Sequence, residues 1–252
     1  MIKDKLVSIV TPTYNSEGYI VETIRSVQNQ TFSNWEMIIV DDCSSDKTPD
    51  IVRQYQREDF RIQFIQLNRN SGPAIARNTG IEKARGSYLS FLDADDIWMP
   101  NFIEFSMETM VEKNSSFVFS SYKRVDENLK PLLKDFIVPN KVTYKDILKS
   151  NPISCLTAFI DIEKLGKKYM PIIRKRQDFG LWLAYLKEID FAFGIKQPLA
   201  IYRIRKESLS RNKWGLIKYQ WIFYHKIEKL GLLNSAYYLC NWMVRGYFKY
   251  KS

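Results

Sequence analysis

Three carboxylates, Asp93, Asp95 and Asp96, follow an apolar segment, residues 88–92, at the place where a buried strand is expected to end. Side chains alternate along an extended chain, so Asp93 and Asp95 are expected to lie on one side, about 6–7 Å apart. Such carboxylates repel each other unless a cation or hydrogen-bond donors lie between them. Their oxygens suit Mg²⁺ or Mn²⁺, with water and phosphate completing the coordination. The alternative is a solvated Asp-rich turn that caps the next helix.

Polar loops also follow the other apolar segments of the N-terminal half. The pattern predicts strands at 6–11, 36–40, 62–66 and 88–92, alternating with helices at 19–28, 49–57 and 73–84. This alternation indicates an α/β fold with a parallel sheet covered on both faces. Right-handed crossovers place the strand-to-helix loops at one edge, where such sheets bind ligands. Loops 11–15, 41–42, 70–72 and 93–95 are therefore expected to meet at one crevice.

The rest of the chain has a looser pattern. It predicts a helix at 102–112, strands at 117–125 and 155–161, a helix from 179 to about 187, an edge strand at 197–204, and two last helices at 216–230 and 233–247 that separate at Gly231. Residues 126–151 have no clear assignment and are expected to cover the acceptor side of the site. No internal repeat is present.

Composition narrows the class of protein. The 252 residues include 45% hydrophobic ones, which suits one large α/β domain or a domain with an appendage. The three cysteines lie far apart in the sequence, which is typical of reduced thiols in a protein of a reducing compartment. No signal peptide and no apolar run of membrane-spanning length is present. These features predict a cytoplasmic protein.

The basic charge is concentrated at the C-terminal end. Residues 201–252 contain 11 of the 38 Lys and Arg but only Glu207 and Glu228 as acids, so they carry almost all of the net charge of +10. Aromatic residues are interleaved with the lysines. Such a segment suits an anionic membrane surface, with the protein peripheral at the inner face of the plasma membrane; equally, the aromatics could pack on the domain while the lysines reach solvent. Nucleic acid is not an expected partner, because that would call for a basic groove through the fold. His225, the single histidine, is expected to be structural.

Six motifs in order resemble those of the family 2 glycosyltransferases. They are VSIVTPTYN at 7–15, IIVDDCSSD at 38–46, NSGPAIARNTG at 70–80, FLDADD at 91–96, QDFGLW at 177–182, and YR at 202–203 with SLS at 208–210. The resemblance implies the GT-A fold, which binds nucleotide sugars. It divides the chain into a glycosyltransferase domain, 1–212, and a basic aromatic helical extension, 213–252. Within the domain, 1–98 would bind the nucleotide and 99–212 would hold the acceptor and the catalytic base.

The resemblance also implies roles for residues at the donor site. Pro12 and Tyr14 match positions that pack on uridine, and Asp42 matches the carboxylate that accepts a hydrogen bond from uracil N3–H. Gly72 would let the backbone approach the ligand, and Arg77 would orient carboxylates or phosphate. The alternatives are a core aromatic at Tyr14, a helix cap at Asp42, a plain turn at Gly72 and a structural ion pair at Arg77.

The same match assigns the metal site and the catalytic base. Asp95 corresponds to the direct ligand of Mn²⁺ or Mg²⁺, and Asp93 to the residue that holds the ribose or a water on the metal, with Asp96 in support. Asp178 corresponds to the base that takes the proton of the acceptor hydroxyl; its alternative is an N-cap of the following helix.

Two positions depart from the usual pattern of the family. Gln177 stands where many relatives have an acidic residue, and Arg205 stands where many have a histidine that can bind the metal. Arginine cannot bind a metal, but it grips phosphate in a bidentate manner. We therefore expect Arg205 to stabilise the departing pyrophosphate.

The function implied by the resemblance is inverting, metal-dependent transfer of a hexose or N-acetylhexosamine. The donor would be a UDP-sugar and the acceptor a glycan or lipid-linked saccharide, in the synthesis of a surface polysaccharide or lipopolysaccharide. The alternative is a catalytically weak protein of the same fold that only binds nucleotide sugars. Dinucleotide-dependent redox chemistry is not expected, because the GxGxxG loop is missing.

Overall fold

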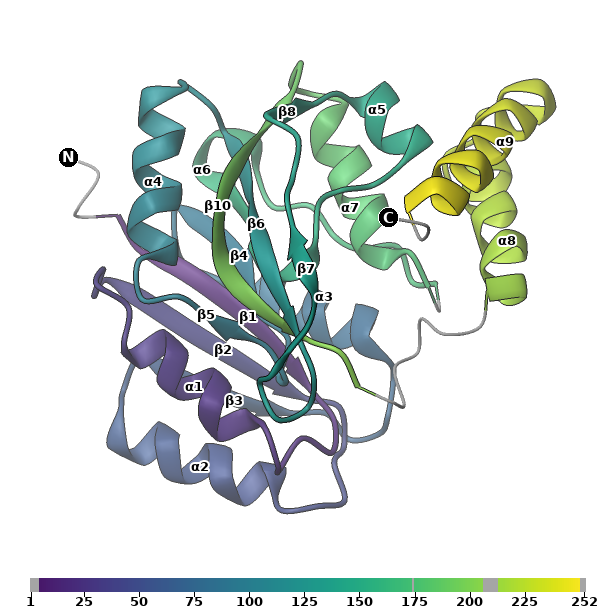
Figure 1. Cartoon of the computed structure of the whole chain (residues 1–252). Coiled ribbons are helices and arrows are strands. Elements are labelled where there is room, and N and C mark those ends of the chain that lie inside the picture. The colour runs from purple at the N-terminus through teal and green to yellow at the C-terminus, as the bar shows by residue number, and fades with distance from the viewer. Residues whose placement is uncertain (1–4, 174, 206–212, 250–252) are drawn as a thin grey trace.

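The computed structural model in Figure 1 describes residues 5–173, 175–205 and 213–249, with side chains left aside at 213–216 and 246–249. The described part contains one ten-stranded sheet with the main strand order β3-β2-β1-β4-β9-β6-β10-β5, while β7 pairs with β6 and β8 with β10. The strands are β1 Val7–Thr13, β2 Trp35–Asp41, β3 Ile62–Gln66, β4 Tyr88–Phe91, β5 Ile97–Trp98, β6 Phe117–Val125, β7 Pro131–Phe136, β8 Lys141–Val142, β9 Ala158–Asp161 and β10 Ala192–Arg203. The helices are α1 Ile20–Gln28, α2 Thr48–Glu58, α3 Pro73–Lys83, α4 Phe102–Glu112, α5 Tyr144–Lys149, α6 Ile162–Leu165, α7 Gln177–Leu186, α8 Lys213–Ile222 and α9 Leu232–Lys249.

The N-terminal half is the predicted parallel sheet. Strand β1 pairs in parallel with β2 and β4, and β2 pairs in parallel with β3. Because side chains alternate along a strand, β1 feeds two cores: Val7 and Ile9 pack with α1, α2 and α4, whereas Val10 packs with α3 and α7. Every residue of β2 is buried, as a central strand covered on both faces requires.

The C-terminal half is mixed rather than parallel. Strand β9 runs antiparallel to both β4 and β6, and β10 pairs in parallel with β6. The expected strand at 155–161 is wrong in its first part, where Cys155–Thr157 is a 3₁₀ turn. The expected edge strand is also wrong, because β10 is longer and is paired on both sides, with β6 and with β5 and β8. Pro198 lies within β10 at a register shift of the pairing with β6.

The C-terminal helices pack against the flank of the domain that carries α5 and α7 (Figure 1). Helix α8 continues into a π-helical turn, Phe223–Ile227, and the chain reverses near Gly231, which has a φ of +73°. The predicted break at this glycine is therefore confirmed. Within the described ranges, no helix combines the length and apolar content needed to cross a bilayer.

Candidate active site

Asp42 joins two loops at the carboxyl edge of the sheet. It follows β2, and its two carboxylate oxygens accept backbone hydrogen bonds from Ser71 N–H at 2.6 Å and Gly72 N–H at 2.8 Å. Gly72 precedes α3 with a φ of +90°, a conformation that favours glycine. Asp42 therefore holds the loop before α3, whereas at the start of α2 it is Asp46 that accepts a hydrogen bond from the Thr48 N–H. Each carboxylate oxygen can accept a further hydrogen bond, which leaves room for one from uracil N3–H. The role of Asp42 in uracil binding stays a prediction.

Tyr14 and Pro12 lie at the end of β1, beside Asp42. The backbone N–H of Asp42 donates to the carbonyl of Thr13 at 2.8 Å, which fixes the two strand ends together. The side chain of Tyr14 is 49% exposed, so the alternative of a core aromatic is wrong. Pro12 is half-buried within β1. An exposed aromatic ring at this edge is free to stack on a flat ring of a ligand.

Arg77 brings together residues that are far apart in the sequence. Its guanidinium donates from Nη2 to Asp93 Oδ1 at 2.5 Å and from Nη1 to Gln177 Oε1 at 3.5 Å. Burial disfavours the charged form of Arg77, but the carboxylates of Asp93 and Asp178 outweigh it and raise the pKa. The structure thus places the end of β4, α3 and the first turn of α7 around one buried cation. Asp178 itself is half-buried.

Asp95 lies opposite a second arginine. Arg205 Nη1 and Asp95 Oδ2 form an ion pair at 3.2 Å. Burial is the main cause that raises the pKa of Asp95, and the negative charge of Asp93 raises it further, while Arg205 offsets only part. The carboxylate is therefore a site where additional positive charge is favourable.

Asp96 supports this site from behind. It is buried, and its Oδ1 accepts a hydrogen bond from the backbone N–H of Arg203 at 2.9 Å, which ties it to the end of β10. Its Oδ2 is buried and has no hydrogen-bond partner among the described residues. Burial raises the pKa of Asp96 well above its usual value, and the charges of Asp95 and Asp93 add to the effect.

The residues at the end of β4 fit a hard divalent cation. Mg²⁺ commonly takes one or two carboxylates, and substrate phosphates and water complete its octahedron. Asp95 and Asp93 supply this kind of oxygen, in a place where negative charge is incompletely balanced. No group of three or more His, Cys, Asp or Glu side chains suited to a metal occurs in the described part of the chain.

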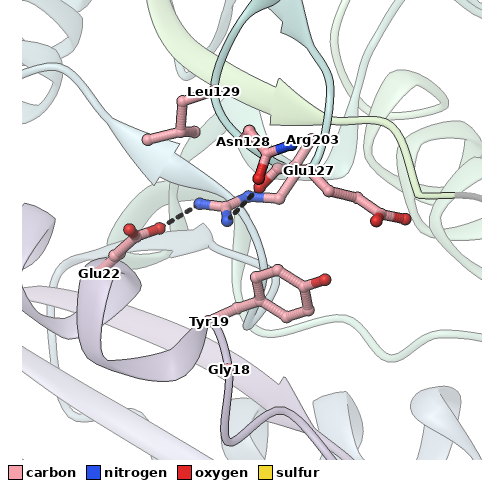
Figure 2. Close-up of a pocket in the computed structure, with 7 residues that line it drawn as sticks. All are labelled: Gly18, Tyr19, Glu22, Glu127, Asn128, Leu129 and Arg203. Atoms are coloured by element: carbon pink, nitrogen blue, oxygen red, sulfur yellow. Dashed lines mark hydrogen bonds and ion pairs between the residues drawn. The ribbon is translucent and has the colours of Figure 1, made fainter.

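Tyr19 and Arg203 are parts of the site that the sequence did not single out individually. Figure 2 shows Arg203 pointing toward Glu22, with which it forms an ion pair, and toward the carbonyl of Glu127. The Tyr19 ring lies 4.8 Å from the guanidinium carbon of Arg203 and 4.9 Å from that of Arg205. Tyr19 and Arg203 border a pocket of about 440 Å³, whose lining residues are Gly18, Tyr19, Glu22, Glu127, Asn128, Leu129 and Arg203. One aromatic ring, that of Tyr19, thus contacts both arginines. In the sequence, the signal for this part of the site was the pair Tyr202-Arg203 followed by Arg205.

Cys155 lies near the charged groups of the site. Burial raises the pKa of its thiol well above the usual value, and Arg77, Asp93 and Asp178 all act on it. A thiol with a raised pKa stays protonated and is a poor nucleophile. It therefore contributes packing next to the carboxylates rather than covalent chemistry.

Replacing Arg77 with methionine is expected to lower the free energy of unfolding by about 3 kcal/mol. The change removes one partner of a buried ion pair and leaves Asp93 without its cation. Urea denaturation measures the effect, and Arg57→Met serves as the control because Arg57 is exposed in the last turn of α2. A loss no larger than the control's, within about 0.5 kcal/mol, would contradict a structural role for the Arg77 ion pair.

Solved structures share the fold. The structure of S. aureus TarS 1–349 in complex with UDP-GlcNAc matches with a TM-score of 0.74 and 22% identity, covering 95% of this chain and 71% of that one. The mannosyltransferase PcManGT from Pyrobaculum calidifontis, in complex with GDP-Man and Mn²⁺, matches with a TM-score of 0.58 and 18% identity, covering 86% of this chain and 60% of that one. The predicted α/β fold of the GT-A type is thereby confirmed.

Sequence relatives extend over nearly the whole chain. TuaG of Bacillus subtilis (strain 168), a glycosyltransferase ascribed to teichuronic acid biosynthesis, is 44% identical over 232 residues, which are 92% of each chain. WfgD of Escherichia coli, a UDP-Glc:α-D-GlcNAc-diphosphoundecaprenol β-1,3-glucosyltransferase, is 36% identical over 249 residues, or 98% of this chain and 96% of WfgD. The family model for glycosyl transferase family 2 matches residues 8–160. With the geometry of the strand-end carboxylates, these matches lead to one conclusion: the chain belongs to glycosyl transferase family 2.

Proposed function

We propose that this protein is an inverting, metal-dependent glycosyltransferase that moves a hexose or an N-acetylhexosamine from a UDP-sugar to a glycan or lipid-linked saccharide. The observation that carries the proposal is the gathering of Asp93, Asp95 and Asp178 around Arg77 and Arg205 at the carboxyl edge of the sheet. Because the chain belongs to glycosyl transferase family 2, these groups are expected to serve the transfer of a sugar from its nucleotide. Residues 1–98 would bind the nucleotide, 99–212 the acceptor, and 213–252 would form an extension to this domain.

The donor would lie across the ends of β1, β2 and β4. Tyr14 is exposed there and can stack on the uracil, and Pro12 completes the same wall. Asp42 would accept the uracil N3–H through a remaining lone pair, and Gly72 leaves the backbone open beside it, because no atom lies within 4 Å of where a Cβ would stand. Mn²⁺ or Mg²⁺ bound to Asp95 would neutralise charge on the diphosphate as it leaves.

Asp178 is suited to the proton transfer. The acceptor hydroxyl oxygen forms a bond to the anomeric carbon while the bond from that carbon to the diphosphate oxygen breaks. The hydroxyl proton passes to the Asp178 carboxylate, and UDP leaves with the electron pair of the broken bond. Attack opposite to the leaving group inverts the anomeric configuration without a covalent enzyme intermediate. The Arg77 guanidinium lies near Asp178, so a cation borders the carboxylate that would take the proton.

The acceptor class is supported by the relatives. WfgD is named for a diphosphoundecaprenol-linked acceptor and TuaG for teichuronic acid biosynthesis. We therefore propose that this protein elongates a surface polysaccharide, on a lipid-linked intermediate at the cytoplasmic face of the membrane. The three free cysteines agree with a reducing compartment.

Measurement of UDP release tests the reaction directly. The protein is incubated with UDP-glucose, UDP-galactose or their N-acetyl forms, with and without Mn²⁺. Release of UDP from one of these donors, at a rate that Mn²⁺ raises, is the expected result. Binding of a UDP-sugar without turnover, with a series of lipid-linked acceptors present, would favour the weak nucleotide-sugar-binding protein instead.

Changing Arg205 to alanine is expected to reduce kcat about 10²-fold, because a charged donor that stabilises the leaving diphosphate is lost. Arg205→Lys should recover part of the rate, since it keeps the charge but loses the bidentate geometry. Steady-state kinetics with saturating UDP-sugar make the comparison, and Arg57→Ala provides an exposed arginine in the last turn of α2 as control. An unchanged kcat in Arg205→Ala would show that its ion pair with Asp95 is only structural.

A further inference from the structure

Helix α9 is apolar on two faces. One face packs on the domain: Tyr238 and Leu239 contact the core that contains α7, and the Trp242 ring lies 5.1 Å from the guanidinium carbon of Arg176. The other face points to solvent although it is also apolar. It consists of Leu232, Leu233, Ala236, Tyr237, Cys240, Met243 and Val244, which follow helical spacing and are all exposed. This set is called the outer face of α9 below.

The exposure of the outer face is large for such side chains. Leu233 is 88% exposed and Val244 is 56% exposed. No charged residue interrupts the face over the three turns that separate these two positions. A contiguous exposed apolar stripe on a helix marks an interaction surface, because solitary exposed apolar residues are common but a continuous row is not.

Positive charge borders the outer face at both ends. Lys226 and Lys229 lie just before α9, and Arg245 follows Val244; all three are exposed. Glu228, the last acidic residue of the sequence, is directed inward, where it pairs with Lys187 at 2.5 Å and accepts a hydrogen bond from Tyr144. Asp146 of α5 is exposed near Arg245 and offsets part of its charge, but Lys226 and Lys229 leave the border of the outer face basic, so its partner is expected to be acidic.

We infer that the outer face of α9 docks on an anionic phospholipid surface. An amphipathic helix with a basic border lies in the plane of the headgroups and buries its apolar side about 5–10 Å deep. A second copy of the chain fits less well: antiparallel pairing of two such faces would bring Lys226 and Lys229 close to Arg245 of the other copy. Acidic lipid headgroups match both the apolar stripe and its border.

The docking helix also contacts the catalytic end of α7. Arg176, which covers Trp242, stands two residues before Asp178, and Lys175 Nζ lies 5.8 Å from the centre of the Tyr219 ring of α8. A membrane bound to the outer face of α9 would thus lie about one helix diameter, roughly 10 Å, beyond the contact between Trp242 and Arg176, on the flank of the domain that carries the start of α7. That this end of α7 is catalytic rests on the proposed function, whereas the docking itself does not.

Co-sedimentation of the full chain with vesicles tests the inference. The wild-type protein is expected to bind vesicles of phosphatidylglycerol and phosphatidylcholine in equal parts, and to bind pure phosphatidylcholine weakly. The double variant Leu233→Glu, Val244→Glu should lower the partition coefficient at least about tenfold, since it places charge on the buried side. Phe60→Glu is the matched control, because Phe60 is an apolar side chain that is 92% exposed in the loop between α2 and β3.

A second set of variants tests the basic border. Each of Lys226→Gln, Lys229→Gln and Arg245→Gln should weaken binding to the phosphatidylglycerol vesicles about fivefold. Added salt should weaken the wild type in the same direction. Equal binding of the wild type to neutral and anionic vesicles would overturn the assignment to an acidic surface.

The remaining outcomes separate docking from catalysis and from folding. All substituted side chains are exposed, so thermal midpoints are expected to equal that of the wild type. Transfer to a water-soluble acceptor should also be unchanged in the double variant. Two results would overturn the inference. One is vesicle binding by the double variant that equals that of the wild type. The other is a wild-type dimer that becomes a monomer in the double variant while vesicle binding does not change. Vesicle binding without UDP release would instead leave docking standing and contradict the proposed transferase.

Discussion

Replacing Asp178 with asparagine is expected to lower the rate of sugar transfer about 10²–10⁴-fold, the usual contribution of a general base, while donor binding stays unchanged. Asparagine keeps the shape of the side chain but cannot take the hydroxyl proton. The position supports this reading, because Asp178 opens α7 beside Arg77 and Asp93. Single-turnover transfer measures the rate, and calorimetry with UDP measures binding.

Asp190→Asn is the control for this change, since Asp190 is an exposed carboxylate shortly after the same helix. It should leave both rate and binding as in the wild type. A transfer rate in Asp178→Asn close to that of the control would remove Asp178 from catalysis. The carboxylate would then serve only at the helix N-terminus, where a negative charge is also favourable.

Asp95→Asn is expected to abolish the Mn²⁺-dependent part of donor binding, with a loss of at least about 100-fold, more than the 10–100-fold that outer-shell changes typically cost. A neutral amide is a poorer ligand for a hard cation than a carboxylate. The change also leaves Arg205 without its anionic partner. Calorimetric titration with UDP, in the presence and absence of Mn²⁺, gives the two affinities.

The pH dependence of the same titration provides a second readout. Because burial and Asp93 raise the pKa of Asp95, its carboxyl holds a proton at higher pH than an ordinary aspartate does. Protons then compete with the metal, so Mn²⁺-dependent binding should rise with pH through a value above the usual aspartate range. Asp135→Asn, an exposed control in β7, should follow the wild type. Equal loss of UDP binding in Asp95→Asn and Asp178→Asn would mean that their roles are wrongly assigned.

Most of the nucleotide half was predictable because its signals are local. Strands β1, β2 and β4 are largely apolar and are followed within two residues by polar ones, Asn15, Asp42 and Asp93, so each strand and the loop after it are encoded within about ten residues. The parallel order then follows from general rules of chain connection. The meeting of the Asp42 loop with Gly72 and of Arg77 with Asp93 is a consequence of that order.

The acceptor half was less predictable because its pairings are not local. β5 is a two-residue strand that exists only through its pairing with β10, and neither its length nor its composition indicates a strand. Residues 126–151 form β7, β8 and α5, of which β7 is almost fully exposed and therefore lacks an apolar pattern. The partner of β5 lies about 100 residues later in the chain and that of β8 about 50 residues later, whereas β7 pairs with the adjacent β6 and is hidden from sequence reasoning only by its exposure.

By itself, the sequence determined the family, the α/β class and the residue types that can bind a diphosphate and a cation, since these depend on short motifs in a fixed order. Only the tertiary structure decided which side chains share their charges: Asp178 with Arg77, Asp95 with Arg205, and both Arg203 and Arg205 with Tyr19. It also decided which aromatics of α9 pack inward and which face solvent. The reason is physical: helical or strand periodicity defines the faces of an element, but contacts with distant elements determine which face is buried.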